Sequence, residues 1–91
     1  MSILLVSYDL KKPDKDYSGL YQALKKASEW WHYLESCWLL KTNLTPQEWF
    51  ERLQPHIDEN DFILIIEIKR NYYGLLPKKA WDWISQKFDS I

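Results

Sequence analysis

The residue with the clearest chemical potential in this sequence is Asp9, which ends a short apolar run. The segment Ile3–Leu10 predicts a strand that is buried on both faces, because its Ile, Leu and Val residues meet polar residues abruptly. A carboxylate at the end of such a strand lies where sheets with helical connections present ligand-binding side chains. Hard divalent ions such as Mg²⁺ are held by one or two carboxylates together with water. Asp9 is therefore the predicted catalytic and metal-binding residue, with Mg²⁺ as the expected cofactor.

One aspartate per chain supplies few ligands, but a two-fold homodimer would bring two copies of Asp9 together. Ser7, Tyr8 and Ser36 are the candidates for positioning a substrate beside it. The alternative interpretation is that Asp9 only accepts hydrogen bonds from the backbone of the following polar loop, as aspartates do in Asx turns. The sequence leaves both interpretations open.

A second candidate site is the basic and aromatic segment that follows the late apolar run. It combines cations, which contact phosphates, with rings, which stack on bases. Its predicted nucleic-acid-binding residues are Lys69, Arg70, Tyr72 and Tyr73, with Lys78 and Lys79 close behind. The alternative is a solvated surface, because 12 basic and 13 acidic residues give a net charge of -1, unlike the basic balance of many nucleic-acid-binding domains.

The remaining reactive side chains predict little chemistry of their own. His32 can act as a general base, but no carboxylate stands at a defined spacing from it, which favours a structural role. Cys37 lies in an apolar run without basic neighbours, which predicts an inert thiol. The cysteine and histidines do not have the spacing of a zinc site. The single cysteine and the absence of a basic N-terminal region and of long apolar runs predict a cytoplasmic protein that does not enter membranes.

The elements that must position these residues follow from periodicity and capping signals. Asp16 can cap a helix whose apolar residues recur at helical spacing as far as Ala27, and Gly19 within it suggests close packing on the sheet. The aromatic segment 30–42 predicts either one bent strand or two short strands divided at Glu35-Ser36. Thr45-Pro46-Gln47-Glu48 is a capping box that opens a helix, which Pro55 kinks or shortens.

The segment 62–68 is the strongest predicted strand, and its apolar residues indicate a place near the middle of the sheet. Pro77 then opens a last helix. If the segment 30–42 supplies two strands, the order of elements predicts an α+β fold, namely a ferredoxin-like βαββαβ sandwich with an additional C-terminal helix. The 91 residues allow one such domain, spanning 1–91.

Three segments of the chain resemble the CRISPR-associated spacer-integration scaffold proteins, the second of the Cas families, and their VapD-type toxin ribonuclease relatives. The likeness lies in Val6-Ser7-Tyr8-Asp9, in Ser36-Cys37-Trp38 and in the strand 62–68, and the order of elements extends it over residues 3–68. The resemblance implies a homodimer that binds or cleaves RNA or DNA. It also implies that Asp9 holds the metal of a nuclease at the dimer interface, whereas scaffold members bind duplex DNA without cutting it.

The rival interpretation is a protein–protein interaction module without catalytic activity. Aromatic residues make up 16% of the chain, including six Trp. Large rings supply buried area in a small core and anchors in subunit interfaces. The sequence predicts that most of these rings serve the core and an interface between copies.

Overall fold

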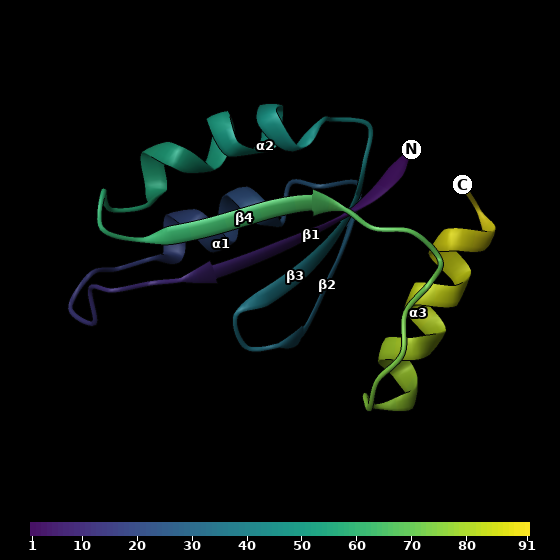
Figure 1. The fold of residues 1–91 in the computed structure, drawn as a ribbon. Helices are drawn as coiled ribbons and strands as arrows, with labels where there is room; N and C mark the ends of the chain where they lie inside the picture. Colours follow the sequence, from purple (N-terminus) through teal and green to yellow (C-terminus); the bar gives the residue numbers. More distant parts are fainter.

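The computed structural model describes residues 1–91 as a four-stranded antiparallel sheet with three α-helices (Figure 1). The elements are β1 (Ser2–Asp9), α1 (Ser18–Leu24), β2 (Glu29–Leu34), β3 (Cys37–Thr42), α2 (Pro46–Leu53) with the 3₁₀ turn Gln54–His56, β4 (Phe62–Glu67) and α3 (Lys78–Asp89). The chain is thus an α+β protein, and none of its helices has the length and apolarity needed to span a bilayer.

The strands lie in the order β2-β3-β1-β4, and each neighbouring pair is antiparallel. The aromatic segment 30–42 forms two strands rather than one, with the turn at Glu35 and Ser36 as its polar interruption. The ladder between β2 and β3 is irregular between Trp31 and Leu34. The ladders that β1 forms with β3 and β4 show no such shift.

The helices α1 and α2 cover one face of the sheet, which we call the packed face (Figure 1). Alternate residues of β1 point to it, because successive side chains of a strand face opposite sides. Its core cluster holds eleven buried residues, and Trp38 and Trp49 are each only 1% exposed. The predicted capping box is confirmed, since the Thr45 hydroxyl accepts from the Glu48 backbone N–H and the Glu48 carboxylate accepts from the Thr45 N–H.

The helix α3 lies against the opposite face but covers only part of it. Its buried Ala80 and Ile84 pack against Ile3, Trp31 and Leu39, and these five residues form a second core cluster. The indole N–H of Trp31 donates to the carbonyl of Ala80 at 3.3 Å, which fixes the helix on the sheet. A long irregular segment, residues 68–77, joins β4 to α3; we call it the strap (Figure 1).

The prediction that the segment 62–68 lies in the middle of the sheet is wrong. β4 is an edge strand, and β1 and β3 occupy the centre. In β4, Ile63 and Ile65 contact the core of the packed face, whereas Phe62, Leu64 and Ile66 point to the other face and are exposed. The strand is apolar on both sides, which is the signature of a central strand, yet the chain itself covers only one of them.

Two smaller predictions also need correction. The helix α1 ends at Leu24 rather than continuing to Ala27, and it begins at Ser18, whose N–H donates to the Asp16 carboxylate at 2.9 Å. Gly19 does not give close packing on the sheet. A Cβ at that position would lie 2.8 Å from Nδ1 of His56. The small residue therefore allows α1 to approach the 3₁₀ turn that follows α2.

Candidate functional site

Asp9 is the last residue of β1 and lies opposite Phe62 in the ladder with β4. Its side chain is 63% exposed, and the carboxylate forms an ion pair with the Lys11 ammonium at 2.6 Å. The hydrogen bonds that an Asx turn would supply from the loop backbone are not formed. The carboxylate is therefore open to solvent, with a lysine as its only charged partner.

The neighbours of Asp9 divide between the two faces of the sheet. Tyr8 points to the packed face, where its hydroxyl accepts from the Trp38 indole at 3.1 Å and donates to the Glu35 carbonyl at 3.3 Å. Burial is the main cause that raises the pKa of Tyr8. Ser7 shares the face of Asp9, and its hydroxyl accepts from the Cys37 thiol at 3.6 Å. Of these residues, only Ser7 lies where it can assist Asp9.

A single copy of the chain does not fit a divalent metal well. The structure brings together no group of three or more His, Cys, Asp or Glu side chains that could hold an ion. The Asp9 carboxylate is one ligand, and the ammonium of Lys11 occupies the position that a cation would take. One copy therefore offers a magnesium ion a single carboxylate at this position.

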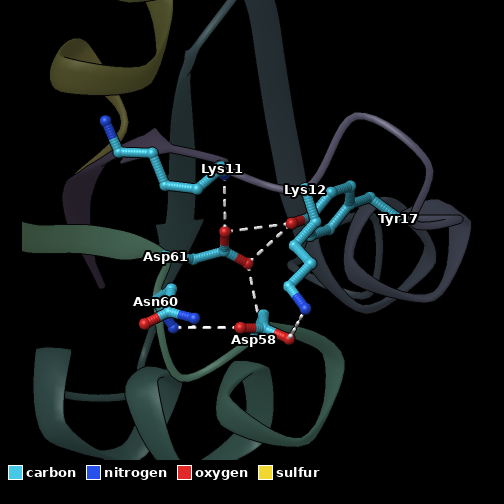
Figure 2. A network of polar contacts seen from close by, with 6 residues as sticks. All are labelled: Lys11, Lys12, Tyr17, Asp58, Asn60 and Asp61. Carbon is cyan, nitrogen blue, oxygen red and sulfur yellow. Dashed lines mark hydrogen bonds and ion pairs between the residues drawn. The ribbon is translucent and has the colours of Figure 1, made fainter.

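The most highly connected carboxylate is Asp61, which the sequence prediction missed (Figure 2). Although it follows an exposed acidic turn, Asp61 is only 8% exposed. It accepts from the backbone N–H of Lys11 at 2.7 Å, from the N–H of Asp58 at 2.8 Å and from the Tyr17 hydroxyl at 2.8 Å. Lys12 adds an ion pair to Asp58 at 3.6 Å. Asp61 thus ties the loop after β1 and the start of α1 to the beginning of β4.

The hydrogen bonds of Asp61 change its own pKa and that of Tyr17. Burial would raise the pKa of Asp61, but the N–H groups of Lys11 and Asp58 and the hydroxyl of Tyr17 outweigh it, so the pKa lies below the ordinary value of 3.8. The pKa of Tyr17 is raised, first by burial and then by its hydrogen bond to Asp61. Asp61 is therefore a carboxylate held in its charged form to organise the backbone, with no free lone-pair direction that the structure aims at a ligand.

The predicted nucleic-acid-binding residues lie on the strap, and much of their chemistry is already used within the chain. The Arg70 guanidinium donates to Asp89 of α3, and Lys78 pairs with Asp82 at 2.9 Å. Tyr72 stacks on Trp81 with ring centroids 5.8 Å apart. Lys69 and Lys79 are exposed, and Tyr73 projects fully into solvent.

The two remaining candidates, His32 and Cys37, have structural contacts. The His32 ring stacks on Trp38 with centroids 4.0 Å apart, and its Nε2 lies 3.0 Å from the Glu35 carbonyl. Together with Tyr21 and Trp30, it covers the indole of Trp38. Cys37 is a free, half-buried thiol beside Ser7.

The largest unexplained feature is the uncovered part of the second sheet face, which we call the open face. Its exposed apolar residues come from the edge strand β4, the end of β2 and the strap: Leu34, Phe62, Leu64, Ile66, Tyr73 and Leu75. They are contiguous, because Leu5 lies opposite Ile66 in the sheet and also lines a groove with Leu34, Tyr73 and Leu75. Asp9 stands at one end of this surface, next to Phe62. The signal in the sequence is the continuous apolar run of β4, which predicts burial on both faces but does not say whether the same chain or a partner covers them.

The two edge strands of the sheet differ in how they are protected. β2 has an irregular ladder, and its Glu29 pairs with Lys87 of α3. Bulges, charges and covering elements are the usual means by which an edge avoids pairing with another molecule. β4 has a regular ladder, and its first charged residue is Glu67 at its end. The unprotected edge is therefore the one that borders the open face.

No protein-family model matches the chain, and no solved structure matches it significantly. The open face and Asp9 are therefore the features from which a function can be inferred.

Proposed function

We propose that this chain is a homodimeric interaction module whose working surface is the open face. The observation that carries the proposal is an edge strand with the composition of a central one. Phe62, Leu64 and Ile66 are 67%, 58% and 41% exposed, although water penalises apolar area by roughly 25 cal/mol per Å². A second copy that covers this surface would give β4 the environment that its sequence indicates. This interaction role ranks above catalysis because the apolar surface extends over three elements, whereas the chemistry depends on one carboxylate.

The fold that we propose for this module is the ferredoxin-like βαββαβ sandwich with an additional C-terminal helix. The strand order with β1 and β3 at the centre supports this assignment, and so does the position of α1 and α2 on one face. In such an arrangement the face opposite the two helices is free for assembly. Here α3 occupies part of that face and leaves the rest open.

The test is the oligomeric state of the wild-type protein and of Leu64→Lys, measured by sedimentation over a range of micromolar concentrations. We expect a dimer for the wild type and a monomer for Leu64→Lys, because a charge within an apolar interface has no partner. Gln22→Lys is the matched control, since Gln22 is exposed on α1, which covers the packed face of the sheet. A wild type that stays monomeric, or a Leu64→Lys protein that still dimerises, would contradict the proposal.

A second candidate function is metal-dependent binding or cleavage of RNA or DNA, as the family resemblance implies. The observation in its favour is that Asp9 adjoins Phe62 on the open face, so that self-association through this face can bring two Asp9 carboxylates near one another. Two carboxylates from two copies would bind Mg²⁺, which would activate water and neutralise charge on the scissile phosphate. Lys69 and Lys79 are exposed and form no ion pair within the chain, so they remain free to contact the phosphates of the nucleic acid.

The experiment for this second function is cleavage of single- and double-stranded RNA and DNA with Mg²⁺ or Mn²⁺. Wild-type protein is compared with Asp9→Asn and with Asp14→Asn, a control on the neighbouring exposed loop. Cleavage by the wild type and Asp14→Asn but not by Asp9→Asn would support a nuclease with Asp9 at its site. Equal cleavage by all three would exclude Asp9, and no cleavage by any would leave binding or assembly as the function.

A further inference from the structure

The strap holds some of its side chains tightly and leaves others without contacts. Tyr72 stacks on Trp81 and packs against Phe88 at 5.8 Å, and Arg70 pairs with Asp89, so that the strap is fixed along α3. Tyr73 and Leu75 nevertheless have exposures of 103% and 97%. Two large apolar side chains are thus presented to solvent by a segment that is itself anchored. Figure 1 shows this segment running beside α3 before it enters the helix.

A groove lies directly beside these two side chains. It has a volume of about 300 Å³ and is bounded by the strap, by α3 and by the sheet. No charged side chain lines it, and its walls are mainly Leu5, Leu34, Leu39, Trp81 and Ile84. A projecting pair of apolar side chains and an apolar hollow therefore stand next to one another on the open face.

The area available on β4 alone does not suffice for a stable dimer. Phe62, Leu64 and Ile66 together expose about 300 Å², if a large side chain offers on the order of 150–250 Å², whereas each partner in a standard interface contributes about 800 Å². Tyr73, Leu75 and Leu34 add about 400 Å² on the same basis. With the strap included, the surface approaches the size that a stable interface needs, and it exceeds the few hundred Å² that a monomer usually exposes.

We propose that the partner seated in this groove is the strap of a second copy, with Leu75 and Tyr73 of each chain inserted beside Leu34 and Trp81 of the other. The inference rests on the proposed homodimer and names the contact that anchors it. A two-fold interface must be self-complementary, and a projection beside a hollow on one surface satisfies that requirement. Leu75 and Tyr73 are then the central anchors of the interface, and the β4 residues surround them.

The experiment is disulfide trapping between two different variants in a Cys37→Ser background. Leu75→Cys and a mass-tagged Leu34→Cys are purified separately, mixed and oxidised. The proposed arrangement predicts a mixed disulfide, because a bridge forms only when the Cα atoms approach to about 4.4–6.8 Å. Gln22→Cys, at an exposed position on α1, mixed with the same Leu34→Cys protein is the control, and we expect it to form at least tenfold less mixed product.

A second measurement uses Leu75→Ser, which removes a fully exposed side chain and therefore leaves the fold of the monomer intact. We expect the dissociation constant of its dimer to be at least tenfold higher than that of the wild-type dimer. The thermal unfolding midpoint of the dilute monomer is expected to be unchanged. A wild-type dimer without the mixed disulfide and with no effect of Leu75→Ser would overturn the strap inference and leave the homodimer standing. A wild-type monomer would instead overturn the proposed function itself.

Discussion

Both faces of the sheet carry mainly apolar strand residues, but the helices of the chain cover the two faces to different extents. On the packed face, alternate residues of β1, β3 and β4 meet α1 and α2, and the cluster they form has no exposed member. On the other face, α3 covers only the part around Ile3, Trp31 and Leu39, and the apolar residues of β4 face solvent. The difference indicates that a strand with apolar residues on both faces is buried in the working molecule, which includes any partner, and not necessarily by one chain alone.

The largest expected effect belongs to the packed face. Trp38→Ala removes a fully buried indole together with its hydrogen bond to Tyr8 and its stacking with His32. We expect the free energy of unfolding to fall by about 3–5 kcal/mol, as is typical for loss of a core aromatic ring. Chemical denaturation measures the change. A loss below about 1 kcal/mol, the size typical of a surface substitution, would mean that this face is less tightly packed than the structure indicates.

The second-largest effect is expected at Asp61, whose hydrogen bonds hold the loop between β1 and α1 against the beginning of β4. Asp61→Asn removes the charge that organises the N–H groups of Lys11 and Asp58, and we expect a loss of about 2 kcal/mol at neutral pH. Because the folded pKa of Asp61 lies below the ordinary value of 3.8, its contribution is fully present above that value and is lost as the pH falls through the folded pKa.

The pH dependence supplies the check on this second prediction. The stability difference between the wild type and Asp61→Asn is expected to shrink as the pH is lowered below about 4, near the ordinary aspartate pKa. Asp14→Asn, on the exposed loop, serves as the control. If the difference between wild type and Asp61→Asn is the same at every pH, the charge of Asp61 is not what stabilises the loop.

A smaller effect is expected at Gly19, where α1 meets the 3₁₀ turn Gln54–His56. Alanine normally favours a helix over glycine by about 1 kcal/mol, but the new Cβ would lie 2.8 Å from Nδ1 of His56. We expect Gly19→Ala to destabilise the protein by about 1 kcal/mol. In a His56→Ala background the same change becomes stabilising. The double-mutant cycle shows whether this contact, rather than helix propensity, determines the residue.

The smallest effect on folding belongs to the open face. Leu64→Ser and Phe62→Ser change side chains that are already more than half exposed, and we expect each to alter the stability of the monomer by less than about 0.5 kcal/mol. Unfolding is followed at concentrations below dimer formation. A loss comparable to that of Trp38→Ala would show that these residues serve the chain's own core and would remove the contrast between the faces.

Much of the fold could be predicted because its signals are local. The capping box at Thr45, the proline that opens α3 and the polar interruption that separates β2 from β3 each lie within a few residues of the element they define. The place of β4 could not be predicted in this way. A strand covered by its own chain and a strand covered by a partner have the same composition.

The candidate site was harder to predict for a related reason. Asp9 was identified by its position at the end of a strand, and the structure places it at the end of β1 with an exposed carboxylate. Asp61 was missed because its partners Lys11 and Tyr17 lie 50 and 44 residues away in the sequence. The sequence predicts that the Arg70 side chain is available to bind phosphate, but in the structure α3 places Asp89 beside it. Contacts between distant segments decide these roles, and a local pattern does not contain them.

The central claim is that a second copy covers the open face, and it is tested most directly by the solvent access of individual methyl groups. Isotope-labelled protein is titrated with a soluble paramagnetic probe at low and at high micromolar concentration. We predict that the methyl signals of Leu64, Ile66 and Leu75 broaden in dilute protein and become protected in concentrated protein, while those of Leu20 and Leu53 on the packed face are protected throughout. If the open-face methyl groups broaden equally at every concentration, no second copy covers them and the account is contradicted.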